Sequence, residues 1–248
     1  MDKPVVLVTG ASRGIGRAAA VALAAAAGYR VALVARGAGE LAEAGRATKL
    51  AGGDRAEIVA DVSRPEECER AVGACVAKFG RLDAVVHAAG VAPVASIEQT
   101  TVEQWRAAVD TNLSAAFYLM KYAWGELARE KPEVGSQKSD VSNGCVVLIS
   151  SLAARDPLAG FGAYGAAKAG VNLLGLVGAR EGQAAGVRVH TIGPGAVETG
   201  MFRAIATEAQ WPREKTLAPE AVAGTIVDCV TGRLAATAGE VIWVHRTV

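Results

Sequence analysis

Tyr164 and Lys168 are the first residues of this chain whose types and spacing suggest acid–base chemistry. They lie four positions apart at a predicted helix start, so that the phenol and the ammonium share one helix face. A phenol has a pKa of about 10, so it exchanges protons near neutral pH only if nearby positive charge stabilises the phenolate. Tyrosine and lysine at this spacing are also common on ordinary helix surfaces, so the pair alone does not define a site.

The stretch T-G-A-S-R-G-I-G at residues 9–16 has two interpretations. It contains G-x-S-x-G, the turn that carries the nucleophilic serine of α/β-hydrolases, which would make Ser12 a covalent catalyst. That turn normally follows a strand deep in the sheet order, whereas this one follows the first predicted strand. The histidines a hydrolase would need, His87, His190 and His245, lie in or at the end of strand-like runs, where a hydrogen-bonded structural role is expected. The hydrolase interpretation is therefore disfavoured.

The second interpretation is a phosphate-binding turn. Gly10 permits a tight turn, Gly14 lets the backbone approach a pyrophosphate, and Gly16 allows close packing of the following helix. A helix predicted over residues 14–27 would direct its N-terminal amides at the phosphates. Ser12 then becomes a hydrogen-bonding residue of the turn.

The glycine motif resembles the coenzyme fingerprint of the short-chain dehydrogenases/reductases, and three later segments fit the same family in order. These are Asp61-Val62 after the third predicted strand, H-A-A-G at residues 87–90, and P-G-x-x-x-T at residues 194–199. The resemblance covers nearly the whole chain. It implies coenzyme contacts by Gly10, Ser12, Arg13, Gly14, Ile15, Gly16, Arg36, Asp61, Val62, Ala89, Gly90, Tyr164, Lys168, Pro194, Gly195, Val197 and Thr199.

The same resemblance implies a catalytic set of Asn112, Ser151, Tyr164 and Lys168. Ser151 lies thirteen residues before Tyr164, at the end of the fifth predicted strand, and would bind the substrate carbonyl, while its neighbour Ser150 would be structural. Tyr164 would protonate the carbonyl oxygen, and Lys168 would tune Tyr164 and bind the nicotinamide ribose. Asn112 would hold a water that relays protons to the lysine; without the family, it could equally be a helix N-cap.

The residues after the second predicted strand indicate the coenzyme. Ala35 stands where NAD-selective relatives carry an acid that binds the ribose hydroxyls. Arg36 follows it and Arg13 lies in the glycine turn, so that two guanidinium groups can converge on a 2′-phosphate. The sequence therefore predicts NADP(H), with two solvated surface arginines as the alternative.

Some positions depart from the family pattern. His87 and Ala88 replace the usual asparagines, and Gly193 replaces the polar or small residue often found before Pro-Gly. The last predicted strand lacks the D-G-G that often closes it in this family.

Seven short apolar runs alternate with alanine-rich stretches of helical length. This alternation predicts an α/β chain with a Rossmann-type, doubly wound, seven-stranded parallel sheet and helices on both faces, forming one domain over residues 1–248. The longest polar interruption, residues 131–144, is expected to be a loop. The predicted strands are residues 5–8, 30–35, 56–60, 82–87, 145–149, 187–192 and 240–244.

Composition excludes several functional classes. The formal net charge of +1 gives no electrostatic footprint for nucleic acid. No apolar run is suited to crossing a membrane, and the chain starts directly with a strand-like segment rather than a signal peptide, so a cytoplasmic protein is expected. The four cysteines include no C-x-x-C pair, so neither a zinc site nor a disulfide is expected.

Together these observations predict an NADP-dependent carbonyl reductase acting on a small-molecule carbonyl or alcohol. A nucleotide-binding redox sensor without turnover is the alternative from another class. Met201, Phe202 and Trp211 lie in residues 200–217, which fold over the substrate in the family and favour an apolar or aryl carbonyl compound. Helices predicted around residues 113–129 and 164–182 are apolar on more than one face, which favours a homodimer or homotetramer, with helices buried deep in the monomer as the alternative.

Overall fold

The computed structural model describes residues 3–129 and 144–246, which form a single parallel sheet of seven strands in the order β3-β2-β1-β4-β5-β6-β7. This is the doubly wound α/β fold expected from the sequence, and the strand bounds differ from the predicted ones by at most two residues. The strands are β1 (Val5–Thr9), β2 (Arg30–Ala35), β3 (Arg55–Val59), β4 (Ala84–His87), β5 (Cys145–Ile149), β6 (Arg188–Pro194) and β7 (Val241–Val244).

The central strands are continuous apolar runs because helices cover both of their faces. Every residue of β1 and β5 is buried. The chain order reverses between β1 and β4, where Thr9 pairs with His87 at the carboxyl ends of the two strands. In open α/β sheets a crevice forms at this reversal, and ligands bind there.

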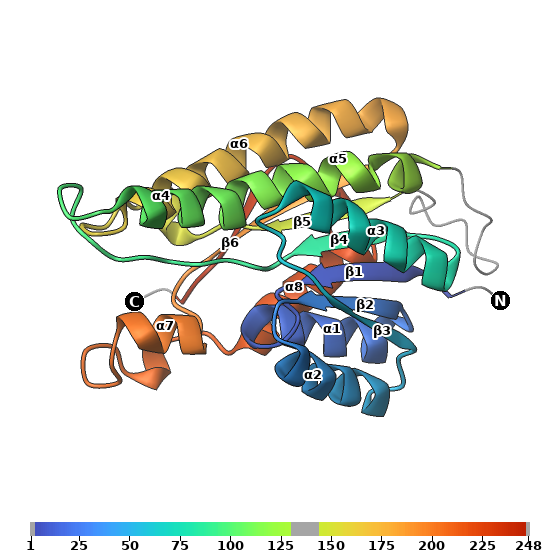
Figure 1. Cartoon of the computed structure of the whole chain (residues 1–248), viewed down its shortest axis with the longest axis horizontal. Coiled ribbons are helices and arrows are strands. Elements are labelled where there is room, and N and C mark those ends of the chain that lie inside the picture. The colour runs from blue at the N-terminus through green and yellow to red at the C-terminus, as the bar shows by residue number, and fades with distance from the viewer. Residues whose placement is uncertain (1–2, 130–143, 247–248) are drawn as a thin grey trace.

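Helices cover the sheet in two layers (Figure 1). The first layer encloses a core with the odd-numbered side chains of β1, and the second encloses the core on the opposite face. Helix α7 (Gly200–Ile205) lies apart from both, beyond the carboxyl end of β6. The first layer contains α3 (Pro65–Phe79), α4 (Val102–Val109), α5 (Ala115–Ala128) and α6 (Gly162–Ala185), and the second contains α1 (Gly14–Ala27), α2 (Ala38–Leu50) and α8 (Pro219–Val230).

One predicted helix differs in an informative way. The segment expected as one helix around residues 113–129 is preceded by a π-helical turn, Asp110–Ser114, that joins α4 to α5. The apolar periodicity of α5 was visible in the sequence, but a local widening of the helix leaves no such signature. Most of the loop predicted at residues 131–144 lies outside the described residues.

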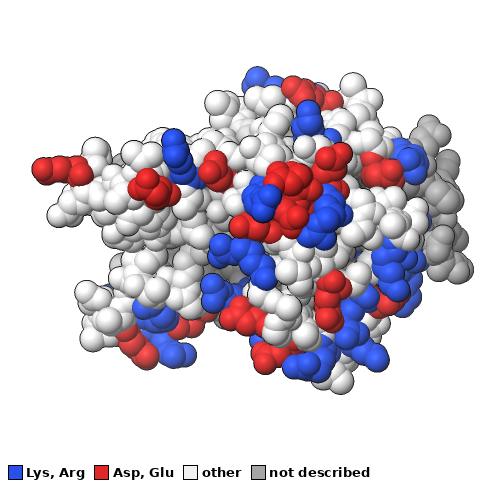
Figure 2. All heavy atoms as spheres, in the orientation of Figure 1, with Lys and Arg blue, Asp and Glu red and all other residues white. Residues whose placement is uncertain are grey.

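Charged side chains of both signs share the surface, and the thiols lie in the interior. Lys and Arg are interspersed with Asp and Glu on the face shown in Figure 2. All four cysteines are buried with free thiols, and burial raises the pKa of each. Among the described residues, no helix is long and apolar enough to cross a membrane.

Candidate active site

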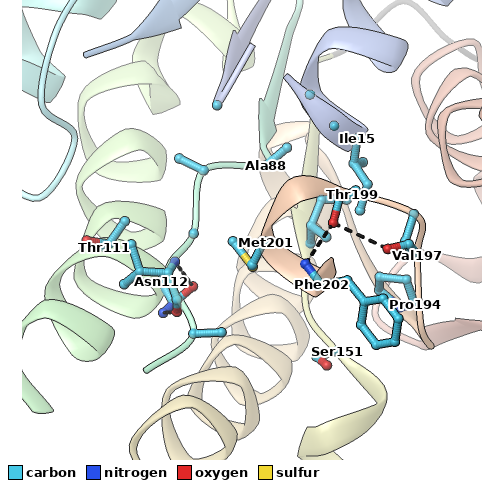
Figure 3. A pocket seen from close by; sticks show the side chains of 18 of the residues that line it. Ile15, Ala88, Thr111, Asn112, Ser151, Pro194, Val197, Thr199, Met201 and Phe202 are labelled. Carbon is cyan, nitrogen blue, oxygen red and sulfur yellow. Dashed lines mark hydrogen bonds between the residues drawn. The ribbon is translucent and has the colours of Figure 1, made fainter. Parts of the chain in front are cut away.

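A cavity of about 710 Å³ opens at the carboxyl ends of the strands. Its wall includes every residue that the sequence analysis assigned to catalysis or coenzyme binding, from Gly10 in the glycine turn to Thr199 before α7. The fold therefore brings together segments that are almost two hundred residues apart in the sequence. Close up, Ile15, Asn112, Ser151 and Thr199 surround one space from four different elements (Figure 3).

The glycine turn has the shape that a dinucleotide pyrophosphate requires. Gly10 and Gly14 adopt φ values of +65° and +56°, which residues with a side chain rarely adopt. A Cβ on Gly16 would lie 2.3 Å from the carbonyl oxygen of Gly10, so residue 16 must also be a glycine. Helix α1 begins here without a side-chain cap, which leaves its first amides available to an anion. These residues fit a nicotinamide dinucleotide.

The far end of the cavity carries charges of both signs. Arg13 and Arg36 both line the cavity, and their shared contact with a 2′-phosphate stays a prediction. The sequence analysis missed Glu40, which lies in the first turn of α2 with its Oε1 3.8 Å from Nη1 of Arg13. Asp61 is oriented by Ser63, whose backbone N–H and hydroxyl both donate to its Oδ1 at 3.1 and 2.8 Å.

Ser151 and Tyr164 are two polar residues of the cavity wall that were assigned to catalysis. The Oγ of Ser151 accepts a hydrogen bond of 3.2 Å from the backbone N–H of Ala153, so its own hydrogen is available to an acceptor in the cavity. Burial raises the pKa of Tyr164, and hydrogen bonding by Ser151 acts in the opposite direction. Ser150, by contrast, is buried and donates to the carbonyl of Lys168, as expected of a structural residue.

Lys168 is only 3% exposed, and its ammonium donates a 2.7 Å hydrogen bond to the carbonyl of Ile149. Burial lowers the pKa of Lys168 to about 7. Its Nζ lies 5.7 Å from the centroid of the Tyr164 ring. Burial thus acts on both groups, raising the pKa of Tyr164 and lowering that of Lys168, and the tuning of Tyr164 by Lys168 stays a prediction.

Asn112 lies inside the π-helical turn and is not an N-cap. Its Nδ2 donates to the carbonyls of Val91 and Ala108 at 2.9 and 2.7 Å, and its Oδ1 accepts from the N–H of Val91 at 3.3 Å. A Cβ on Gly90 would lie 2.7 Å from this Oδ1 and 3.8 Å from Nζ of Lys168. Gly90 therefore keeps open the space between the amide and the ammonium.

Two of the three histidines are buried, and each has a threonine hydroxyl beside its Nδ1. For the Nε2 atoms of His87 and His190, the described part of the chain supplies no hydrogen-bond partner. Nδ1 of His87 lies 2.9 Å from Oγ1 of Thr9, which accepts from the N–H of Ala89. Burial lowers the pKa of His87 to about 3, so its ring is neutral. His245 is exposed beyond the last strand, and none of the three lies beside Ser12 in the cavity wall, which removes the hydrolase interpretation.

Thr199 serves α7 as well as the cavity. Its Oγ1 caps α7 by accepting from the N–H of Phe202, and it contacts the carbonyl of Val197 (Figure 3). Apolar side chains line the adjacent wall, including some that sequence reasoning did not assign to the site. They are Leu158, Phe161, Met201, Phe202, Ile205 and Trp211.

The unusual Gly193 is explained by the last strand. A Cβ on Gly193 would lie 2.4 Å from Cε3 of Trp243 on β7, so only glycine leaves room for the indole. The guanidinium carbon of Arg155 lies 4.8 Å from the centroid of the Trp243 ring. The glycine at residue 193 and the tryptophan of the last strand thus belong to one packing arrangement.

A doubly wound sheet, a bare glycine turn and a Ser-Tyr-Lys cluster in one cavity define a dinucleotide-dependent oxidoreductase as the class of protein. The chain belongs to the short chain dehydrogenase family, whose sequence profile matches residues 4–210. The family binds a nicotinamide coenzyme, and the protein is an oxidoreductase that acts on CH–OH and C=O groups.

Several relatives are similar over most of their length. An acetoacetyl-CoA reductase of Shinella zoogloeoides is 36% identical over 81% of this chain and 77% of its own. A 3-oxoacyl-[acyl-carrier-protein] reductase of Synechocystis is 33% identical over 90% and 87%. The structure of an actinorhodin polyketide ketoreductase with NADPH superimposes with a TM-score of 0.88 at 27% identity, covering 98% of this chain and 96% of that one.

Proposed function

We propose that this protein reduces a ketone, diketone or 3-oxoacyl compound to the alcohol with NADPH. Three similar proteins have names that describe reductions of this kind, and one of them was crystallised with NADPH. The observation that carries the proposal is the meeting of Ser151, Tyr164 and Lys168 in one cavity with the bare glycine turn.

In the proposed reaction, the bound nicotinamide supplies the hydride. The Ser151 hydroxyl donates to the substrate carbonyl oxygen and so holds the carbonyl carbon in place. The phenol of Tyr164 gives its proton to the same oxygen as negative charge develops there. Lys168 stabilises the resulting phenolate when it is protonated, and its pKa of about 7 lets it release and regain that proton near neutral pH.

Asn112 positions the groups that restore the proton. Its amide hydrogens are occupied by the carbonyls of Val91 and Ala108, whereas its Oδ1 keeps a second lone pair. Gly90 leaves open the space between this oxygen and the Lys168 ammonium. A water held there would connect Lys168 to solvent.

The preference for NADPH rests on Arg13 and Arg36. Each can make charge-assisted hydrogen bonds to a 2′-phosphate, which contribute roughly 1.5–3 kcal/mol apiece. The double variant Ala35→Asp with Arg36→Leu should reverse the preference, because a carboxylate repels the phosphate and accepts hydrogen bonds from an unmodified ribose. The ratio of kcat/KM for the two coenzymes in wild type and variant measures this, and a wild type that favours NADH contradicts the assignment.

An apolar or aryl substituent on the substrate fits the rest of the cavity. Phe202 and Trp211 pack edge to face with ring centroids 6.2 Å apart, and both line the cavity beside Met201 and Leu158. An apolar wall of this kind binds hydrocarbon next to the carbonyl.

The proposed function is tested with a panel of 3-oxoacyl thioesters, ketones and diketones. Turnover of each compound is measured as the loss of NADPH absorbance. Turnover of at least one class is expected, with compounds carrying apolar chains or rings preferred. Coenzyme binding with no NADPH consumption across the panel would contradict catalysis and favour a redox sensor.

We also propose that the protein is a homodimer or homotetramer assembled through α5 and α6. These helices lie side by side on the outside of the molecule (Figure 1). Phe117 on α5 is 49% exposed, and Leu173 and Val177 on α6 are 63% and 40% exposed. Large apolar side chains exposed on neighbouring helices are typical of an interface between subunits.

A further inference from the structure

Glu40 is a carboxylate in a place where the proposed coenzyme brings negative charge. It lies in the first turn of α2 and in the cavity wall, and its Oε1 is 3.8 Å from Nη1 of Arg13. Both side chains keep more than half of their surface exposed, so solvent and a ligand can reach the pair.

Positive charge other than Arg13 also lies near the start of α2, in the residues just before Glu40. Arg36 and Gly37 line the same part of the cavity, and Gly37 is the N-cap of α2 without a side chain to satisfy the first amides of the helix. The helix N-terminus adds partial positive charge to the two guanidinium groups. Glu40 is thus a carboxylate that neutralises the Arg13 guanidinium when no phosphate is bound.

We propose that Glu40 is a specificity-determining residue, an internal counter-ion that a 2′-phosphate must displace from Arg13. This inference rests on the proposed use of NADPH. The carboxylate stabilises the guanidinium in the free protein and repels a phosphate dianion in the complex, so it weakens NADPH binding on both counts. NADH lacks the 2′-phosphate, so Glu40 does not weaken NADH binding in this way. Glu40 therefore reduces the preference of the protein for NADPH over NADH.

The effect should be modest because the pair is exposed. Exposed ion pairs contribute little and are screened by salt, so removal of the Glu40 charge should strengthen binding of the 2′-phosphate by about three- to tenfold at low ionic strength. The gain should shrink as salt is added, whereas a change in packing would not depend on salt.

Calorimetric titration with adenosine 2′,5′-bisphosphate and with 5′-AMP tests the inference without turnover. The two probes differ only in the 2′-phosphate. Glu40→Gln should tighten binding of the bisphosphate and leave 5′-AMP within about twofold of wild type. Glu43→Gln is the matched control, because Glu43 is an exposed acid of the same helix outside the cavity wall.

The Arg13→Gln background tests the mechanism. If Glu40 acts by occupying Arg13, most of the gain from Glu40→Gln should disappear once Arg13 is absent. The inference is overturned if Glu40→Gln binds the bisphosphate no better than Glu43→Gln does. It is also overturned if Glu40→Gln binds the bisphosphate more weakly than the wild type, because Glu40 would then orient Arg13 for the phosphate rather than compete with the phosphate for Arg13.

Failure of the inference is distinguishable from failure of the proposed coenzyme. If the wild type prefers NADH in kcat/KM, the NADPH assignment fails, while a tighter bisphosphate complex of Glu40→Gln still supports the counter-ion. If the wild type prefers NADPH and the bisphosphate affinity of Glu40→Gln is unchanged, only the counter-ion is refuted.

Discussion

Tyr164 carries the most direct prediction at the scale of single residues. Tyr164→Phe removes the transferable proton and retains the ring that packs against Phe161. We expect kcat to fall by about 10²- to 10⁴-fold, the contribution typical of a general acid, with coenzyme affinity changed by only a few-fold. Steady-state kinetics and a coenzyme fluorescence titration measure the two effects separately.

Tyr118→Phe, on α5 and outside the cavity wall, is the control for loss of a phenol elsewhere. Its kinetics should match those of the wild type. If Tyr164→Phe retained activity within a few-fold of wild type, the proton would have to come from another group.

Lys168 gives a prediction about stability and pH. Its pKa is lowered from 10.5 to about 7 in the folded protein, so between these pH values the unfolded chain holds a proton that the folded protein has released. Raising the pH through this range therefore stabilises the folded wild type, and Lys168→Met lacks that gain. We expect the variant to be stabilised relative to wild type most strongly at or below pH 7, with the difference narrowing toward pH 10.

Chemical denaturation of the coenzyme-free proteins at several pH values measures this difference. Activity should be lost in Lys168→Met at every pH. A stability difference that stays constant from pH 7 to 10 would show that the ammonium is not penalised by burial.

At this scale the sequence predicted the cavity residues well but not their charge states. The spacing of Ser151, Tyr164 and Lys168 follows from one strand end and one helix, which local patterns reveal. The low pKa of Lys168 and the raised pKa of Tyr164 depend on how many atoms exclude water from them, and that depends on the whole fold.

The glycine turn and α1 give the prediction at the scale of elements. Gly16→Ala would place a methyl group 2.3 Å from the carbonyl oxygen of Gly10, so the turn and the helix must separate. Because the helix amides then no longer converge on the pyrophosphate, we expect coenzyme affinity to fall by about tenfold or more. Titration with NADPH and with 5′-AMP measures the loss.

Gly73→Ala is the matched control. Gly73 lies on the exposed side of α3 with no atom within 4 Å of the new methyl position, so this change should stabilise the protein by up to about 1 kcal/mol and leave coenzyme binding intact. Normal coenzyme affinity in Gly16→Ala would mean that close packing at this position does not shape the phosphate site.

Strands and long helices were predictable because their side chains repeat with the period of the element. The π-helical turn at Asp110–Ser114 was not, since the shift that it causes in the apolar period is confined to one turn and too short to stand out in the sequence. It matters nonetheless, because the turn directs Asn112 at Val91 rather than at the N-terminus of a helix.

At the scale of the whole molecule, the prediction concerns assembly. Leu173→Glu places a charge on the exposed face of α6, where a subunit interface would bury it. We expect the variant to sediment as a smaller species than the wild type. Leu50→Glu is the control, because Leu50 is 90% exposed at the end of α2, away from this face.

Identical sedimentation of wild type and Leu173→Glu would exclude this face as the interface. The parallel topology itself was predictable, since alternating strands and helices leave few ways to form a sheet that is covered on both sides. The arrangement of subunits depends on surfaces that come together only after folding, so the sequence indicated apolar helices without specifying what covers them.

The contact between Gly193 and Trp243 constrains how this chain could have diverged from its relatives. A side chain at residue 193 collides with the indole, so any replacement of Gly193 is harmful while Trp243 is present. Loss of the indole first leaves a gap beside β6 that a later side chain can fill. The two positions are therefore coupled in one direction, because a larger side chain at residue 193 is tolerated only after the indole of Trp243 has been removed.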